Sequence, residues 1–114
     1  MTEKILEKKS QADFNERVLQ IVMQIPFGKV TTYGHIASAL GSRKSSRMVG
    51  YALNSVKDRI NIPCHRVINR NGELSGKLHF ATPTLMRELL EAEGVEFNGE
   101  SVNLPNYLWI PTTE

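Results

Sequence analysis

The chain has 114 residues, enough for one modest hydrophobic core, so we expect a single domain with one site. A hydrophobic content of 40% and a charged content of 23% are ordinary for a globular protein, and no apolar run approaches the roughly 20 residues that span a bilayer. The net charge of +2 is too small to attract nucleic acid by itself, so nucleic-acid binding would need a local basic patch.

The N-terminal stretch MTEKILEKKSQAD is charged throughout and lacks the apolar core of a signal peptide, so nothing in it directs export. The only cysteine, Cys64, cannot form an internal disulfide, which fits a reducing compartment. We therefore expect a cytoplasmic protein that does not contact a membrane. Residues 1–114 form one domain in this interpretation, with residues 1–12 and 110–114 as flexible ends.

The first predicted helix covers residues 13–25, where apolar side chains recur at a spacing that places them on one face. Pro26 and Gly28 then stop it. The apolar face consists of Phe14, Val18, Leu19, Ile21, Val22 and Ile25.

Two short helices are predicted next, separated by a tight turn. Thr31 or Thr32 caps the first and Gly41 ends it, and Ser42 caps the second, which lies in the stretch SRKSSRMVGYALNS. Their inward-facing residues are Ile36, Ala37 and Leu40, then Met48, Val49, Ala52 and Leu53. The pair matches a helix-turn-helix whose basic patch is Arg43, Lys44 and Arg47, although two simply packed helices would show the same pattern.

The second half of the chain predicts less regular structure. INIPCHRVI is rich in β-branched residues and too short for a helix, and NRNG at 69–72 predicts a turn. Thr82 and Pro83 open a last helix that turns Leu85, Met86, Leu89 and Leu90 inward until Gly94. The tail is expected to be a loop with Tyr107 and Trp109 as aromatic anchors.

Cys64 lies within PCHRV and has two interpretations. It is either a small buried apolar residue or a nucleophile, and a nucleophilic thiol needs a cation, a base or a backbone dipole to lower its pKa. His65 follows directly, but neighbours on a strand point to opposite faces, so contact between them requires a turn, which Pro63 makes plausible. Arg66 has the simpler alternative role of a structural ion-pair partner.

Over residues 14–94 the chain resembles the O6-alkylguanine-DNA alkyltransferases. PCHRV resembles their acceptor-cysteine motif, IPFGKVTTYGHIASALG the entry to their helix-turn-helix, SSRMVGYAL their recognition helix, and LLEAEG the helix that carries their catalytic glutamate. The resemblance implies a mainly α, winged-helix-like domain with a small β element. It also implies binding of duplex DNA through the minor groove, base flipping and irreversible alkyl transfer onto the protein.

Residue by residue, the resemblance implies that Cys64 accepts the alkyl group, that His65 acts on it through a water and that Glu93 orients His65. Arg47 would enter the base stack and Tyr33 would push on the neighbouring phosphate. The implied DNA-binding set is Tyr33, Arg43, Lys44, Ser46, Arg47 and Gly50, and the implied substrate pocket is Tyr33, Pro63, Val67, Ser75 and Lys77. The simpler alternatives are a core aromatic for Tyr33, a solvated helix-end carboxylate for Glu93 and a nonspecific phosphate contact for Arg47.

The segment SGKLHFATP at 75–83 departs from the glycine-rich pocket loop of the enzymes, with Lys77 where an aromatic is expected. The family's hinge asparagine aligns with Val56, and Asn54 is only a nearby candidate. The altered loop, the lack of the enzymes' additional N-terminal domain and the tail VNLPNYLW instead resemble the alkyltransferase-like proteins. These bind the lesion, commonly carry Trp or Ala in place of the cysteine, and pass the lesion to nucleotide excision repair.

We therefore predict a monomeric DNA repair protein that binds O6-alkylguanine in duplex DNA and transfers the alkyl group to Cys64. The alternative is a lesion sensor that recruits nucleotide excision repair proteins. No cofactor is expected, and one cysteine with three scattered histidines shows no metal-ligand spacing. A chain of this length leaves no room for the scaffold of a papain-like hydrolase, which argues against that class.

Overall fold

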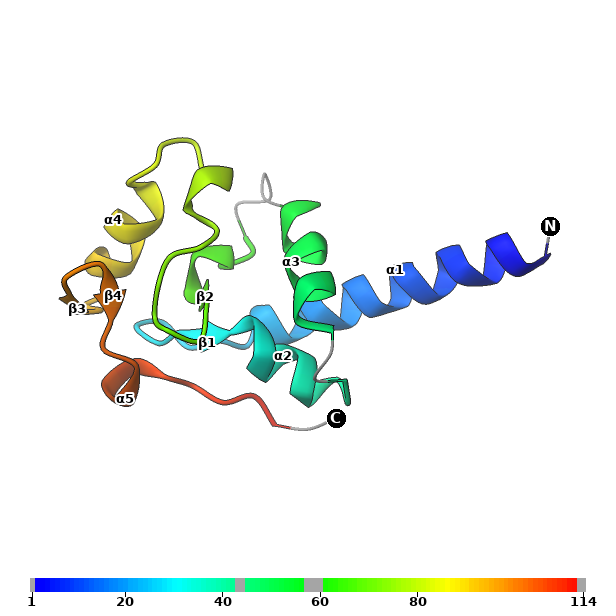
Figure 1. Ribbon diagram of the computed structural model, residues 1–114, viewed down its shortest axis with the longest axis horizontal. Coiled ribbons are helices and arrows are strands. Elements are labelled where there is room, and N and C mark those ends of the chain that lie inside the picture. The colour runs from blue at the N-terminus through cyan, green and yellow to red at the C-terminus, as the bar shows by residue number, and fades with distance from the viewer. Residues whose placement is uncertain (1, 43–44, 57–60, 113–114) are drawn as a thin grey trace.

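The computed structural model describes residues 2–42, 45–56 and 61–112, with the side chains of the first helix described from residue 12 onward. The described part measures 50 × 29 × 21 Å, and helix α1 (Thr2–Val22) extends well beyond the rest of it (Figure 1). No helix in these ranges is long and apolar enough to cross a membrane. The fold is mainly α with short strands, as the sequence predicts.

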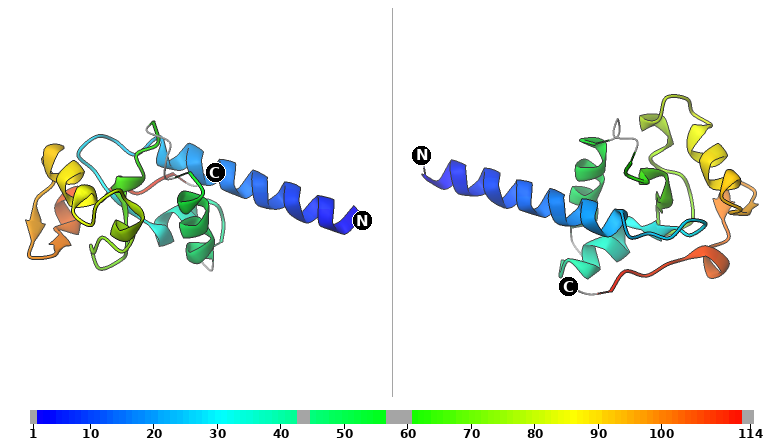
Figure 2. Two further views of the ribbon diagram at one scale, coloured as in Figure 1. Left: turned by 90° about the horizontal axis from the view of Figure 1, so that it is seen from above. Right: turned by 180° about the vertical axis from the view of Figure 1, so that it is seen from behind.

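One hydrophobic cluster joins the three N-terminal helices. The end of α1 packs with α2 (Tyr33–Ala39) and α3 (Ser46–Asn54), which together form the predicted helix-turn-helix (Figures 1 and 2). Its fully buried side chains include Val18, Val22, Ile25, Ile36 and Val49. The helix expected from Asp13 instead begins at Thr2 and ends at Val22, three residues before its predicted end.

Local signals define α2 but not the start of α3. Thr32 caps α2, because its hydroxyl accepts a hydrogen bond of 3.1 Å from the His35 amide, and Gly41 follows in the left-handed conformation at φ 83°. The prediction of Ser42 as the cap of α3 is wrong, since the helix is preceded by Ser45 and the two serine hydroxyls bond each other at 2.8 Å. Arg43 and Lys44 lie outside the described residues.

A second cluster lies at the other end of the domain. It includes Val30, Ile68, Met86, Leu90 and Val95, with helix α4 (Leu85–Ala92) packed over it. The prediction of Thr82 as the helix cap is wrong: α4 starts at Leu85, and Thr82 contributes only its carbonyl to the Leu85 amide at 3.3 Å. Leu89 is 36% exposed, while Gly94 ends the helix at φ 89° as expected.

Short strands hold the two clusters together. Strand β1 (Thr31–Thr32) pairs in parallel with β2 (Val67–Ile68). Strand β2 directly follows the short 3₁₀ helix η2 (Cys64–Arg66). The tail contains structure that the sequence did not predict, namely the hairpin of β3 (Phe97–Asn98) and β4 (Ser101–Val102) and the short helix α5 (Leu104–Tyr107).

The tail aromatics act as the predicted anchors. The Trp109 amide donates to the Val30 carbonyl at 2.7 Å, and the Val30 amide donates to the Tyr107 carbonyl at 2.9 Å. Tyr107 packs on the second cluster and Trp109 on the first, so the tail spans both. The turn that carries Cys64 contacts both parts, because Cys64 packs on the first cluster and η2 lies against α4.

Candidate active site

Cys64 begins a tight turn of the chain. After Pro63, the amide of Arg66 donates to the Pro63 carbonyl at 3.0 Å, and residues 64–66 form η2 rather than a strand. Successive side chains in such a helix point about 120° apart, so the three residues face different surroundings. The turn that a contact between Cys64 and His65 would require is therefore present.

Glu93, at the C-terminal end of α4, contacts several hydrogen-bonding groups around the turn. Its Oε2 accepts from Arg66 Nη2 at 2.9 Å and contacts His65 Nε2 at 2.6 Å, and its Oε1 accepts from Arg66 Nε and from the Gly28 amide at 2.9 and 2.8 Å. Only 8% of the Glu93 side chain is exposed, so it is not a solvated helix-end carboxylate. Arg66 also donates to the Ile25 carbonyl at 2.9 Å, which gives it the structural role left open by the sequence.

These donors keep Glu93 ionised. Burial alone would raise the pKa of Glu93, but the hydrogen bonds from Arg66, the Gly28 amide and His65 outweigh it and lower the pKa to about 2. An ionised carboxylate can only accept, so Nε2 of His65 must carry the proton in their contact. In a neutral imidazole, Nδ1 is then left as a proton acceptor.

Cys64 has a very different environment. The residue is half-buried and packs against the first hydrophobic cluster, and no hydrogen bond joins its thiol to His65 among the described contacts. Burial raises the pKa of the Cys64 thiol, although a backbone hydrogen bond partly opposes the shift. The thiol is therefore protonated at neutral pH in this state.

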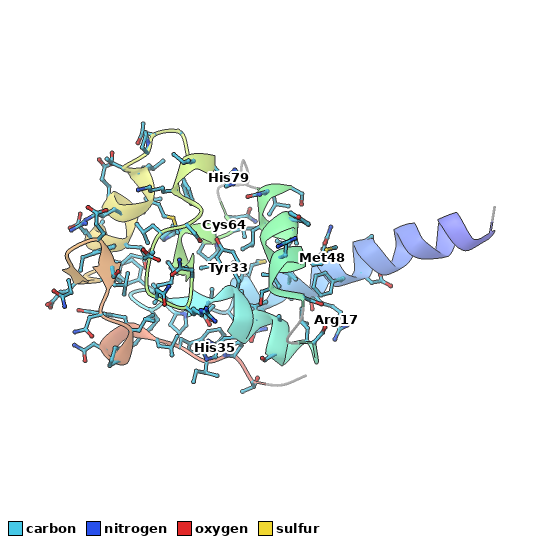
Figure 3. The ribbon with its side chains drawn as sticks, viewed as in Figure 1. Arg17, Tyr33, His35, Met48, Cys64 and His79 are labelled. Carbon is cyan, nitrogen blue, oxygen red and sulfur yellow. The ribbon has the colours of Figure 1, made fainter. Side chains whose placement is uncertain are left out.

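A small pocket of about 30 Å³ lies beside Cys64, large enough for one or two waters but not for a purine. Of the residues expected in the substrate pocket, Tyr33 and Val67 line this space. The other lining residues are Leu53, Asn54, Gly76, His79, Phe80 and Met86. In Figure 3 the Tyr33, Cys64 and His79 side chains lie in the region between α3 and the loop that contains η3 (Lys77–His79). Burial raises the pKa of Tyr33, and the nearby Cys64 raises it further. A hydrogen bond to Ser75 acts in the opposite direction.

The pocket adjoins an open groove of about 360 Å³ under α3. Ser46, Arg47 and Gly50 line this groove from the helix, together with Tyr33 and Ser75, so five predicted residues meet here. Four residues line both spaces: Tyr33, Asn54, Gly76 and His79. No sequence pattern pointed to Tyr51, Gly76 or His79, and Asn54 was expected only as a hinge candidate.

Two residues of the predicted pocket lie elsewhere. Lys77 lines a separate cavity of about 670 Å³ with Glu73, Arg87 and Glu100, and Pro63 lines one of about 540 Å³ on another side of Cys64. The prediction placed Lys77 in the pocket by aligning it with an aromatic, but the 3₁₀ turn at 77–79 presents His79 to the pocket instead. Within the described residues, no group of three His, Cys, Asp or Glu side chains could hold a metal.

The family model described as "6-O-methylguanine DNA methyltransferase, DNA binding domain" matches residues 13–95. The chain belongs to this family. Alkyltransferase-like protein 1 of Schizosaccharomyces pombe is 38% identical over 104 residues, which cover 87% of this chain and 96% of that protein. The DNA base-flipping protein of Escherichia coli is 41% identical over 107 residues, which cover 90% and 80% of the two chains.

Solved structures and an enzyme relative extend the family match. S. pombe Atl1 in complex with damaged DNA containing O6-carboxymethylguanine has a TM-score of 0.76 at 37% identity and covers 88% of this chain and 97% of its own. Mycobacterium tuberculosis OGT in complex with DNA has a TM-score of 0.63 at 39% identity, with 71% and 49% covered. A methylated-DNA–protein-cysteine methyltransferase of Methanosarcina acetivorans is 42% identical over 72% of this chain, which spans 51% of that relative.

Proposed function

We propose that this member of the O6-methylguanine DNA methyltransferase family binds O6-alkylguanine in duplex DNA and transfers the alkyl group once to Cys64. The observation that carries the proposal is the position of Cys64. One side of it borders the pocket that adjoins the α3 groove, and the residue next to it is a histidine paired with an ionised carboxylate. Nucleophile and base therefore come from one turn.

The chemistry balances within these groups. The thiol proton passes to Nδ1 of His65 through a water, the thiolate sulfur attacks the alkyl carbon, and the bond between that carbon and O6 breaks. The electron pair stays on the guanine oxygen, and the proton returns to guanine, so the products are an S-alkyl cysteine and unmodified guanine. Glu93 stabilises the imidazolium that exists between these proton transfers.

DNA binding rests on the groove and the helix above it. Arg47 is exposed on α3 at the groove, where it can enter the base stack, and Tyr33 lies where the groove meets the pocket. Extruding a base costs a few kcal/mol, which these contacts must offset. Arg43, Lys44, Ser46 and Gly50 complete the proposed DNA-binding set, and the protein acts as a cytoplasmic monomer.

A second candidate function is lesion sensing without transfer, followed by recruitment of nucleotide excision repair proteins. Two observations favour it: the raised pKa of the thiol and a similarity to Atl1 that covers nearly all of that chain. In this case Cys64 would contact the lesion without reacting.

Intact-protein mass after mixing with an O6-methylguanine duplex distinguishes the two functions. Transfer predicts a gain of one methyl group on the peptide that contains Cys64, once per molecule. The Cys64→Ala variant should show no gain and should still bind the lesion. An unchanged mass despite tight lesion binding would leave sensing as the function, and equal affinity for lesion and undamaged duplex would contradict both.

A further inference from the structure

The groove under α3 contains an exposed aromatic side chain to which neither the family resemblance nor the proposed chemistry assigns a role. Tyr51 is 56% exposed and lines this groove with Arg47 and Asn54. These three residues are four and three positions apart on α3, so they share one face of the helix. The exposed ring of Tyr51 offers apolar area that a stacked base could cover.

The order of these residues along the helix gives Tyr51 a place on the path of the extruded base. At a rise of about 1.5 Å per residue, Tyr51 lies about 6 Å along α3 from Arg47 and about 4.5 Å from Asn54. Arg47 borders only the groove, whereas Asn54 borders both the groove and the Cys64 pocket. A base that leaves the stack at Arg47 and moves toward Cys64 therefore passes Tyr51.

The pocket through which the groove reaches Cys64 cannot hold this base without rearrangement. The Cys64 pocket measures about 30 Å³, while the groove measures about 360 Å³. His79 lines the groove from the opposite element, η3, and also borders the pocket. The groove therefore offers the Tyr51 ring on the α3 side and the His79 imidazole on the loop side, next to a pocket that is too small for a base.

We propose that Tyr51 stacks on the extruded O6-alkylguanine in the groove, and so stabilises it before and during its entry into the Cys64 pocket. This inference rests on the proposed function and adds a binding residue to it. Base–aromatic stacking compensates part of the stacking that the base loses on leaving the duplex, and it requires the ring but not the hydroxyl.

The test measures affinities for three duplexes in the Cys64→Ala background, which prevents transfer. One duplex contains O6-methylguanine, one contains an abasic site at the same position, and one is undamaged. Tyr51→Ala should weaken binding to the lesion duplex by about 5- to 150-fold, the range expected for one base–aromatic stack. On the abasic duplex, which offers no base to stack, the loss should stay below about twofold.

Two further variants identify the cause. Tyr51→Phe should retain the affinity of the parent for the lesion, since the ring is kept. Ile110→Ala is the matched control, because Ile110 is 62% exposed and lies in the tail away from the groove, and it should change nothing. Arg47→Ala should lower the slope of log affinity against log salt by about 1, whereas Tyr51→Ala should leave the slope unchanged.

Unchanged lesion affinity in Tyr51→Ala would overturn the inference, as would an equal loss on the abasic duplex, which would indicate contact with the flanking DNA. A loss in Tyr51→Phe as large as in Tyr51→Ala would assign the effect to the hydroxyl and also overturn stacking. If the parent protein itself bound lesion and undamaged duplex equally, the proposed function would fail, independently of Tyr51.

Discussion

The two sides of the 64–66 turn differ in how completely their polar groups are paired. On one side, Arg66 and His65 meet Glu93, which also accepts the Gly28 amide, so a charged group sits in a dense set of short hydrogen bonds. On the other side, the Cys64 thiol lies among apolar side chains next to a small pocket and an open groove. Adjacent residues thus have different roles. His65 and Arg66 fix the turn through Glu93, whereas no such set of hydrogen bonds surrounds the Cys64 thiol.

Breaking the paired side should have the largest effect. Glu93→Gln removes the charge that Arg66 faces in a site where the two side chains are only 15% and 8% exposed. An unpaired buried charge is costly, so the free energy of unfolding should fall by about 3 kcal/mol in urea denaturation.

Glu91→Gln is the matched control for this substitution. Glu91 lies on the same helix in an exposed pair with Arg87 at 3.5 Å, and its loss should change the free energy of unfolding by less than about 0.5 kcal/mol. If Glu93→Gln changed the free energy of unfolding as little as Glu91→Gln does, the Glu93 contacts would not stabilise the fold.

The same carboxylate predicts a dependence of stability on pH. The pKa of Glu93 in the folded state is about 2, below the ordinary value of 4.5, so the unfolded state binds its proton first. The stabilisation is complete above about pH 5 and is lost as the pH falls toward 2. Urea denaturation at several pH values should show this loss in the parent and a flatter profile in Glu93→Gln, and two identical profiles would contradict the prediction.

The thiol side gives the smallest predicted effect. Because burial raises the pKa of Cys64, the folded protein should react with iodoacetamide at pH 7.5 more slowly than the same chain in urea. Mass spectrometry measures both rates on one cysteine, so the unfolded chain is its own control. A faster reaction in the folded protein would show that the thiol is already activated without DNA.

Local signals in the sequence predicted local structure well. Thr32 at the start of α2 and the glycines at 41 and 94 act through neighbouring residues alone, and all three have the predicted role. The start of α1 was missed because the strong helix formers before Asp13 were taken as a charged tail. Ser42 and Thr82 were wrong caps because several Ser or Thr residues lie near each helix start, and the helices are preceded by Ser45 and Thr84 instead.

The site was predictable only where the resemblance supplied a role. The contact of His65 with Glu93 was expected from the family, but the bonds of Glu93 to Arg66 and Gly28 join residues 27 and 65 positions apart that no periodicity connects. Tyr51 was missed because its position on the exposed face of α3 becomes significant only once η3 is seen across the groove. Lys77 was placed in the pocket because the comparison with the family's loop gives only its position in the sequence, and the 3₁₀ turn at 77–79 was not predicted.

The wide sequence separation of the Glu93 partners also has a consequence for folding. The turn with the thiol is anchored by a residue that is synthesised 27 positions later, and that residue is itself held by an amide 65 positions earlier. Contacts this distant close large loops and form late, whereas the helix-turn-helix depends on nearby residues and can form early. A nascent chain would therefore form its helix-turn-helix before the turn at Cys64, and the cysteine would take up its final geometry only when α4 docks.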